Sequence, residues 1–508
     1  MTTLATWALA VSGVAVVFLL LTLWATGRFA KRKHGPPSTA LPLGQGTALD
    51  LLLAQREASN AGQTGSYLLD NPAEALRVRL ATAQLAERSL DLLYYIWEDD
   101  LSGRVLAQAI LEAADKGVRV RLLLDDVNVL NRDPVYRALD RHPRIEVRLF
   151  NPIRNRDRGF LRGLEILFNL LPYNRRMHGK LWIADGRVAI TGGRNIGDPY
   201  FGLLEGPKPN YVDLDLLLTG DVLRDAEQLF DTFWNSGVAL PIRTLWPGKR
   251  TRLSRFRSRL TRALGQPQLR GRLAPLALQE PKDARSVLGL ERLIWAPDVS
   301  FLGDPPDKAL GTGPDAWMPQ SLLPILGSAQ HSLRIMTPYF VPGPRGLKAL
   351  TDLAKSGVSV EVITNGLALA DNVFVHGAYR WYRHRLLREG VRIYEVAPKD
   401  GARLMLHSKA FLIDGTQGFV GSFNFDLRSA FLNTELGVVF DDPTLVAELF
   451  ARFEDAKDPQ QAFSLTLEGR FPTWSRGDGP ATHIEPESNA LKRMVSFVIG
   501  QLPIHRFL

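Results

Sequence analysis

The chain reads MHGKLWIAD at residues 177–185 and continues to GGRN at residues 192–195. The second half repeats this wording with LHSKAFLID at residues 406–414 and GSFN at residues 421–424. Both copies follow the pattern His-x-Lys-x4-Asp-x6-Gly-[Gly/Ser]-x-Asn without a gap. A single His-x-Lys means little in a chain with nine histidines. Two copies of this pattern, with different apolar residues between the shared positions, indicate an internal duplication in which each half carries the same functional residue types.

The sequence around the two motifs is duplicated as well. In the first half, an amphipathic helix pattern at 71–88 precedes a strand, helix and strand at 90–97, 104–116 and 118–124. In the second half, the strand, helix and strand return at 332–340, 346–355 and 358–363. The phrase ADKGVRV at 114–120 also aligns with AKSGVSV at 354–360. A strand–helix–strand unit with a short glycine turn predicts an α/β fold with a largely parallel sheet covered by helices.

The composition indicates a multidomain globular protein with anionic partners. The chain has 508 residues, of which 45% are hydrophobic and 23% charged. Its formal net charge of +9 favours nucleic acid or an anionic lipid surface as a partner. The absence of cysteine excludes disulfides, thiolate zinc sites and a lipoprotein anchor.

The N-terminal segment is predicted to be a membrane anchor. Residues 4–25 carry no charge, and at about 1.5 Å per residue they would form a helix of roughly 33 Å, enough to cross a bilayer. Trp7 and Trp24 stand near the two ends, as interfacial aromatic residues do. A cleaved signal peptide is the rival interpretation, but the first residues lack its basic region. Basic residues at 28–33 follow the helix and predict that the body lies on the cytoplasmic side.

Composition shifts divide the chain into six parts. We expect a transmembrane anchor at 1–27, a tether at 28–47, a first domain at 48–245, a basic linker at 246–285, a second domain at 286–465 and a C-terminal tail at 466–508. The linker holds nine Lys and Arg residues between 249 and 272 with no acid among them. A solvated linker and a segment at the membrane surface both fit this pattern.

Two apolar stretches have no counterpart in the duplication. An insertion at 160–172, FLRGLEILFNLLP, stands directly before the first motif, where the second half has a short loop. It fits either a core helix or a segment that contacts acyl chains or the membrane. The tail at 490–508 is apolar with a few basic residues, and it could dock on the protein or on the membrane.

Each motif copy is predicted to span a β-hairpin. In the first copy, residues 180–184 form a strand, Asp185-Gly186 the turn and residues 187–191 the return strand, and Asp414-Gly415 is the corresponding turn in the second copy. Side chains alternate along a strand, so the histidine and the lysine of each copy point to the same face. The glycine after each return strand lets the backbone approach a ligand closely.

Each half thus offers one imidazole, one cation and one amide at a single spot. The candidates are His178, Lys180 and Asn195 in the first half and His407, Lys409 and Asn424 in the second, with Gly193 and Ser422 beside the amides. If the halves face each other, this set suits a phosphodiester. The cations and amides would hold non-bridging oxygens, one imidazole would attack phosphorus, and the other would protonate the leaving oxygen. No cluster of His, Asp and Glu has metal-ligand spacing, so we expect neither a metal nor a cofactor.

The paired motifs resemble those of the phospholipase D superfamily, and the resemblance covers nearly all of the chain after the N-terminal segment. The phrases GRNIGDPYF at 193–201 and FWNS at 233–236, with the apolar tail, are similar to the bacterial cardiolipin synthase C branch in particular. The resemblance implies two duplicated α/β/α sandwich domains of phospholipase D type, each with a mixed sheet, packed face to face around one shared active site. The N-terminal transmembrane helix would be added to this pair.

The resemblance also implies a two-step reaction through a phosphohistidine, without a metal ion. We expect His178 to carry the phosphatidyl group, and His407 to act first as acid and then as base. Asp185 and Asp414, which complete the two motifs, would be structural residues of the turns rather than acid–base groups.

In the superfamily an acidic residue further along the chain orients each histidine. Glu435 fits this role in the second half, and Asp213 fits it in the first, with Asp215 as the alternative. Gly193 stands where the second half has Ser422, so the first half is expected to lack one hydroxyl contact.

The sequence therefore predicts a membrane-bound phosphatidyltransferase that makes cardiolipin from phosphatidylglycerol and a second phospholipid. Phosphatidylglycerol and phosphatidylethanolamine both remain open as donors. The expected partners are phospholipids and the inner membrane of a bacterium, crossed once, and not nucleic acid; the oligomeric state stays open. A hydrolytic phospholipase D, a nuclease of the same superfamily and an inactive membrane scaffold are the alternatives.

Overall fold

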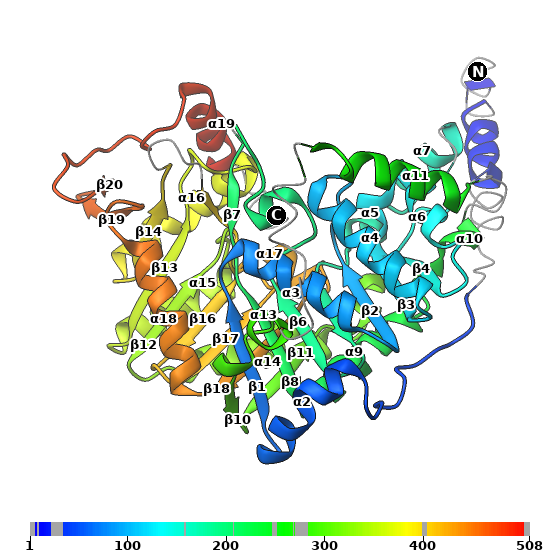
Figure 1. Cartoon of the computed structure of the whole chain (residues 1–508). Helices are drawn as coiled ribbons and strands as arrows, with labels where there is room; N and C mark the ends of the chain where they lie inside the picture. Colours follow the sequence, from blue (N-terminus) through cyan, green and yellow to red (C-terminus); the bar gives the residue numbers. More distant parts are fainter. Residues whose placement is uncertain are drawn as a thin grey trace.

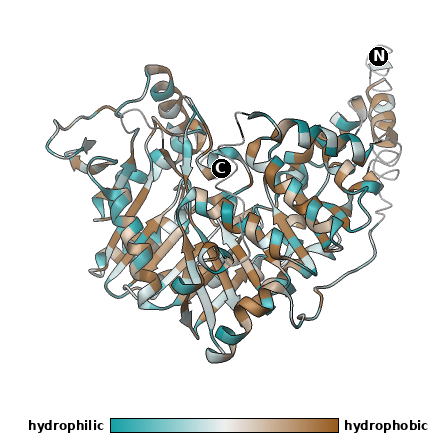
Figure 2. Cartoon of the chain, in the orientation of Figure 1, coloured by the Kyte–Doolittle hydropathy of each residue, from teal (hydrophilic) through white to brown (hydrophobic). Residues whose placement is uncertain are grey.

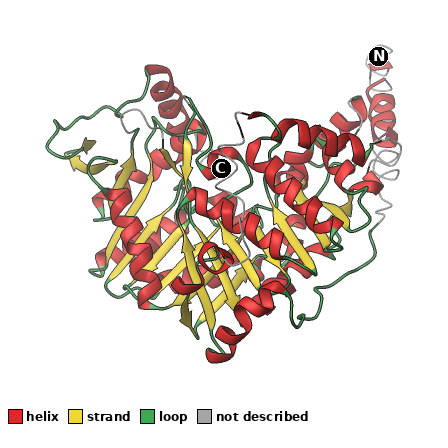
Figure 3. Cartoon of the chain, viewed as in Figure 1, coloured by secondary structure: helices red, strands yellow, loops and turns green. Residues whose placement is uncertain are grey.

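The computed structural model describes residues 6–7, 10–21, 34–156, 159–206, 208–245, 251–267, 269, 283–398 and 404–501. It contains two nine-stranded mixed sheets, one in each half of the chain, with helices around them (Figures 1 and 3). The prediction of two α/β domains with mixed sheets is confirmed. The largely parallel sheet expected from the strand–helix–strand units is wrong, because only three neighbouring strands of each sheet are parallel.

The first sheet has three parallel strands in a row, with antiparallel strands on both sides. Its strands lie in the order β10 (Ile294–Ala296), β1 (Thr64–Leu69), β8 (Asp215–Gly220), β6 (Val188–Gly192), β5 (Lys180–Ala184), β2 (Ser89–Tyr94), β3 (Arg119–Asp125), β4 (Ile145–Phe150) and β9 (Ala239–Pro241). The hairpin β5–β6 carries the first motif and lies at the centre of the sheet.

The second sheet repeats this arrangement. Its order is β11 (Val299–Gly303), β18 (Leu436–Asp441), β17 (Gln417–Gly421), β16 (Ala410–Ile413), β12 (Ser332–Met336), β13 (Ser359–Asn365), β14 (Arg392–Val396), β19 (Ala462–Glu468) and β20 (Phe471–Ser475). Strands β12, β13 and β14 are parallel, and the hairpin β16–β17 carries the second motif. A further pair, β7 (Asn210–Val212) and β15 (Leu404–Leu406), is parallel and joins the two halves.

Helices cover both sheets. In the first half they are α2 (Ala48–Ser59), α3 (Pro72–Leu85), α4 (Leu101–Asp115), α5 (Asp126–Val129), α6 (Asp133–Leu139), α7 (Phe160–Phe168), α8 (Leu170–Asn174), α9 (Leu223–Trp234) and α10 (Ile242–Leu245), followed by α11 (Leu253–Leu264). In the second half they are α13 (Ala284–Val287), α14 (Met318–Gly327), α15 (Gly343–Lys355), α16 (Val373–Arg388), α17 (Leu427–Phe431), α18 (Pro443–Lys457) and α19 (Ala490–Gln501). Short 3₁₀ turns stand at η1 (Asp198–Phe201), η4 (Leu290–Arg292), η5 (Pro306–Leu310) and η6 (Pro314–Ala316).

Local sequence signals account for the ends of the predicted helices. The side chain of Asn71 caps α3 by accepting from Glu74 N, with Pro72 in the first turn. Asp100 caps α4 in the same way, by accepting from Gly103 N. Gly117, just beyond the end of α4, has φ of +103°, which a glycine adopts without strain.

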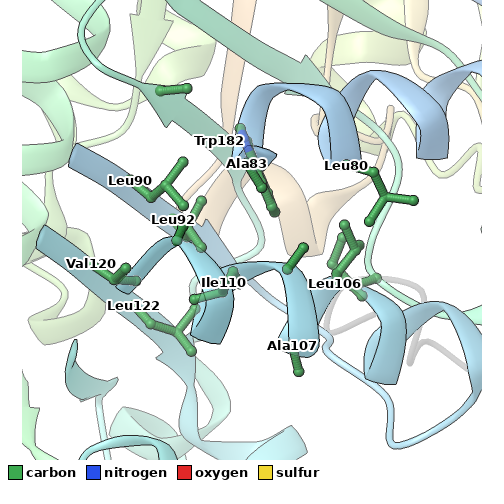
Figure 4. Packing of buried hydrophobic residues seen from close by; sticks show 14 of the residues in the cluster. Leu80, Ala83, Leu90, Leu92, Leu106, Ala107, Ile110, Val120, Leu122 and Trp182 are labelled. Atoms are coloured by element: carbon green, nitrogen blue, oxygen red, sulfur yellow. The ribbon is translucent and has the colours of Figure 1, made fainter. Parts of the chain in front are cut away.

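Hydrophobic residues, brown in Figure 2, recur along the strands and along the helices that cover them. In the first half, leucines and valines of β2 and β3 pack against Leu106 and Ile110 of α4 (Figure 4). A second cluster draws on both halves, with Leu181 and Phe230 from the first and Leu412 and Phe453 from the second. Since this cluster buries the two motif hairpins together, it fixes the halves face to face.

The expected membrane anchor lies only partly within the described residues. Residues 10–21 are helical, whereas residues 1–5, 8–9 and 22–33, including the basic residues expected to orient the anchor, lie outside the described residues. Among the described residues, no helix is both long enough and apolar enough to span a bilayer.

Two strands cross the domain limits expected from composition. Strand β10 stands at the start of the expected second domain, but it pairs with β1 at the edge of the first sheet. Strand β20 falls in the expected tail, but it closes the second sheet beside β19. Strand β10 has a weak local signal, because it is only three residues long and its partner β1 lies far away in the sequence, whereas β20 pairs with β19, its neighbour in the sequence. The limits themselves stay a prediction.

Candidate active site

The aspartates of the two motifs hold the hairpins in place. Asp185 and Asp414 stand in the turns, both with φ of +51°. Asp185 accepts hydrogen bonds from the backbone N–H groups of residues 87, 88 and 89, at 2.8–2.9 Å. Asp414 accepts the equivalent three from residues 330, 331 and 332, each at 2.7 Å. Each carboxylate therefore joins its hairpin to the start of the neighbouring parallel strand, which fits the structural role expected for it.

The two histidines are held by acids from the opposite half. His178 Nδ1 lies 2.8 Å from Glu435 Oε2, and His407 Nδ1 lies 2.6 Å from Asp213 Oδ2. The backbone crosses in the same way, since His178 N donates to Thr434 O and His407 N donates to Val212 O, both at 2.8 Å. Neither half thus contains a complete histidine–acid pair, and the site exists only where the halves meet.

Asp215, the alternative candidate, has a different partner. Its carboxylate accepts from Arg79 Nη2 at 2.8 Å and from Arg194 N at 3.1 Å, deep in the first half. Asp215 therefore fixes two arginines in the core, and Asp213 alone of the two contacts a histidine.

Burial keeps both imidazoles neutral. It lowers the pKa of His178 to about 4, against the opposing effect of Glu435. It also lowers the pKa of His407 to about 3, with help from Lys409, whose Nζ lies 2.9 Å from His407 Nδ1. Burial alone would raise the pKa of Glu435 and Asp213, but the facing histidines and lysines outweigh it and hold both pKa values below their usual range. An ionised carboxylate only accepts hydrogen bonds, so Nδ1 of each ring donates and Nε2 carries the lone pair. The Nε2 of His407 lies 3.4 Å from Lys409 Nζ.

The two lysines are buried cations within the same site. Burial lowers the pKa of Lys180 to about 7 and that of Lys409 to about 8. Each ammonium group donates to the carbonyl of the histidine two residues earlier. A phosphodiester anion at this place would raise the pKa of both lysines and of the histidines, because opposite charges favour each other's ionised form.

The small residues and amides next to the hairpins differ between the halves. Ser422 Oγ donates to Glu435, whereas a Cβ at Gly193 would lie only 2.0 Å from Asp213 Oδ1. Asn195 donates to the Tyr200 hydroxyl at 2.9 Å and accepts from Ile96 N at 3.1 Å. The buried Oδ1 of Asn424 has no hydrogen-bond partner among the described residues.

Three tyrosines surround the histidines and were not expected from the sequence. Tyr95 meets the His178 ring edge to face, with centroids 5.0 Å apart. Tyr211 stacks on His407 at 5.1 Å, and Tyr200 meets the same ring edge-on at 5.3 Å. Tyr95 could have been found, because it directly follows a parallel strand, at the strand end where α/β sites gather. Tyr200 and Tyr211 belong to η1 and β7, short elements within the long connection between β6 and β8, which has no periodic signal.

The described residues contain one cluster with metal-ligand residue types, formed by His376, Glu395 and Glu485. Arg383 binds both carboxylates, at 3.0 Å each, so a guanidinium already occupies the position of a cation. The cluster belongs to the packing of α16, and it contains neither motif histidine.

The fold and this geometry define a two-histidine phosphodiester site of the phospholipase D type. One imidazole can act as nucleophile through Nε2, the other can exchange a proton with an oxygen on the opposite side of phosphorus, and two buried lysines can bind the non-bridging oxygens.

The comparisons place the chain in a family. The family model described as "Cardiolipin synthase, PLD-like domain" matches residues 80–209 and 322–457, one match in each half. Cardiolipin synthase C of Escherichia coli is 36% identical over 89% of this chain and 98% of its own length. Cardiolipin synthase A of Salmonella paratyphi B is 27% identical over 84% of this chain and 76% of its own. The chain belongs to this family, the cardiolipin synthase type of phospholipase D-like enzymes.

A solved structure supports the fold. The phosphatidylserine synthase of Haemophilus influenzae superposes with a TM-score of 0.56, over 89% of this chain and 97% of that one. Its sequence identity is 16%, so the likeness concerns the arrangement of the two halves.

Proposed function

We propose that this enzyme makes cardiolipin by moving a phosphatidyl group from one phospholipid to the hydroxyl of phosphatidylglycerol. The crosswise pairing of His178 with Glu435 and of His407 with Asp213 supports this best, since it presents two imidazoles to one phosphodiester. The relatives named as cardiolipin synthases favour phospholipid over nucleic acid as the substrate.

In the first step His178 Nε2 attacks phosphorus and the bond to the head-group oxygen breaks. His407 gives its proton to that oxygen, and the departing head group takes it away. Burial holds His407 neutral at pH 7, with a pKa of about 3. The bound phosphodiester anion therefore has a second role, which is to raise the pKa of His407 until it can carry the proton.

In the second step the neutral His407 takes the proton of the acceptor hydroxyl. The acceptor oxygen attacks phosphorus, and the phosphorus–nitrogen bond to His178 breaks. Lys180, Lys409, Asn195 and Asn424 bind the non-bridging oxygens through both steps. A water in place of the hydroxyl would give phosphatidic acid, which is the hydrolytic alternative.

The membrane location belongs to this proposal. The segment at 4–25 would anchor the enzyme once in the inner membrane of a bacterium, with the two domains on the cytoplasmic side. Neither substrate would then need to leave the bilayer, which suits two lipids that each carry two acyl chains.

The test is to incubate the purified full-length protein with labelled phosphatidylglycerol, with and without phosphatidylethanolamine. Cardiolipin with release of glycerol identifies phosphatidylglycerol as donor, and cardiolipin with release of ethanolamine identifies phosphatidylethanolamine. Phosphatidic acid as the main product, with no cardiolipin, would contradict the proposal in favour of hydrolysis.

A further inference from the structure

The insertion before the first motif is folded with its apolar side outward. Among the described side chains of α7 and α8, the buried one is that of Glu165, which accepts from Arg154 N at 2.8 Å and Asn155 N at 2.7 Å. Large apolar residues are exposed instead: Phe160, Leu167, Phe168, Leu170 and Leu171, with Phe160 and Leu171 each 74% exposed. An amphipathic helix on the surface of a water-soluble protein has the reverse arrangement, with its apolar face toward the core.

The C-terminal helix α19 is folded in the same inverted way. Its inner face is made of Ser496, Ile499 and Gly500, and Ser496 Oγ lies 3.1 Å from His376 Nδ1 on α16. Its outer face presents Leu491, Met494, Phe497 and Val498, all more than half exposed. Two separate helices thus expose contiguous apolar faces of a kind that marks a binding surface.

Both helices border the active site. Arg428 of α17, just after the second motif, donates to Asn174 O and Asn174 Oδ1 at the end of α8. Lys492 of α19 donates to the carbonyls of Ala368 and Ala370. The next residue, Asp371, accepts from Tyr339 and influences the pKa of Lys409. The two apolar faces therefore flank the histidines from the first and the second half.

The same end of the molecule carries the N-terminal helix and a basic helix. Figure 1 shows α7, α11 and α19 at the end opposite α2, with the N-terminal helix beside α7. Phe18 of that helix meets Phe168 of α7, with ring centroids 4.9 Å apart. Helix α11 and its N-cap residue expose four arginines, at 252, 255, 259 and 262, and the helix contains no acid.

We infer that the outer faces of α7–α8 and α19, with the exposed arginines of α11, form one surface that inserts into a bilayer containing anionic phospholipid. The apolar faces would enter the boundary between head groups and acyl chains, and the arginines would bind the lipid phosphates. The contact between Phe18 and Phe168 puts this surface where the expected anchor reaches the domains. The inference rests on the proposed function, because it brings the mouth of the site to the head-group layer that holds the substrates.

The absence of cysteine allows a direct test. Single-cysteine variants of the full-length protein, Leu171→Cys and Met494→Cys, would carry an environment-sensitive fluorophore in vesicles of phosphatidylglycerol and phosphatidylcholine with spin-labelled quencher lipids. Leu51→Cys is the matched control, because Leu51 is 71% exposed but belongs to α2 at the opposite end. We expect strong quenching at 171 and 494 and none at 51. Equal quenching at all three positions, or none at 171 and 494, would overturn the inference.

A second comparison separates this surface from the chemistry. The double variant Phe160→Glu/Leu171→Glu should lower turnover of vesicle substrate about tenfold or more, because two charges enter the apolar face. Its turnover of a soluble short-chain phospholipid should equal that of the unaltered protein, and Leu51→Glu should change neither. Loss of both activities in the double variant would contradict a role confined to the membrane. The quenching result stands independently of whether cardiolipin is the product, so the two proposals can fail separately.

Discussion

The two halves share the backbone hydrogen bond next to the acid that faces a histidine, but they differ in the residue that contacts this acid. Gly193 N donates to Leu214 O at 2.9 Å, and Ser422 N donates to Leu436 O at 2.8 Å. In the second half the longer Glu435 leaves room for a serine, whose hydroxyl donates to it. In the first half the shorter Asp213 lies so close to the backbone that a Cβ at 193 would touch its carboxylate.

The difference shows that residues 193 and 213 form one unit, as residues 422 and 435 do. The sequence alone indicated that the first half lacks a hydroxyl contact. In the structure the carboxylate occupies the place of that hydroxyl, so the glycine is a steric requirement of the shorter acid. The halves also differ in their amides, because Asn195 is engaged by Tyr200 and Ile96, whereas Asn424 Oδ1 has no partner among the described residues.

The largest loss of activity is expected from substitution of the histidines, and comparing the two variants distinguishes the roles of the halves. His178→Ala removes the nucleophile and His407→Ala the acid, so each should lower cardiolipin formation by about a thousandfold or more. With a nitrophenyl leaving group, which needs no acid, only His407→Ala should still release nitrophenol. Near-normal turnover of His407→Ala with glycerol as the leaving group would rule out the two-histidine scheme.

The second effect concerns the small residue beside each acid. Gly193→Ser should lower turnover by about a hundredfold, because its Cβ displaces Asp213 from His407. Ser422→Gly should cost only about tenfold, since it removes one of the two serine hydroxyls that donate to Glu435, and Ser429 Oγ still donates to it at 2.8 Å. Steady-state kinetics of the purified variants would check the order.

A compensating change sharpens this comparison. The double variant Gly193→Ser/Asp213→Glu gives the first half the pair found in the second, and it should recover part of the activity lost in Gly193→Ser. If the fold loss of turnover in the double variant equalled the product of the fold losses in Gly193→Ser and Asp213→Glu, residues 193 and 213 would not act as a unit.

The third prediction concerns pH. The pKa of His178 is about 4 and that of His407 about 3 in the folded protein, compared with about 6.5 for an unperturbed histidine. The unfolded chain therefore takes up protons first as the pH falls, so the stability due to the neutral imidazoles is complete above about pH 6.5 and is lost towards pH 3–4. Thermal unfolding midpoints should fall over this range, and less steeply for His407→Gln. An unchanged slope in His407→Gln would contradict the assigned pKa direction.

The smallest effect is expected from metal removal. Lys180 and Lys409 supply the positive charge for the phosphoryl oxygens in a symmetric way, one from each half, so a chelator should leave turnover unchanged. The measurement needs substrate in neutral micelles, so that divalent ions do not act through the lipid surface. Complete loss of activity, restored by a divalent ion, would oppose this prediction.

The sequence predicted the repeated parts of the molecule well. Local sequence patterns that are present in each half predict the doubled hairpins and the parallel strands beside them. Local signals also predict the helix limits at Asn71 and Gly117. The pairing of Asp213 with His407 could not be read from the sequence, because it joins residues 194 positions apart, across the halves. The positions of Tyr200 and Tyr211 could not be predicted for a similar reason, since the segment that carries them pairs with the other half of the chain.

The exposure of α7 and α8 is a different case. The apolar insertion fitted a core helix as well as a membrane contact, because periodicity shows which residues share a face but not which face is buried. In the structure the buried Glu165, held by the backbone of residues 154 and 155, leaves the apolar residues exposed and excludes the core helix. Those partners come from a loop that has no sequence signature.

The covalent step is the most direct test of the account. His407→Ala would be incubated with a phospholipid analogue that carries a nitrophenyl leaving group, digested and analysed by peptide mass spectrometry. We expect the mass of a phosphatidyl group on the peptide that contains His178, and no such mass in the double variant His178→Ala/His407→Ala. Release of nitrophenol without any adduct on His178, or an adduct on His407 when His178→Ala is tested, would contradict the assignment of His178 as the nucleophile.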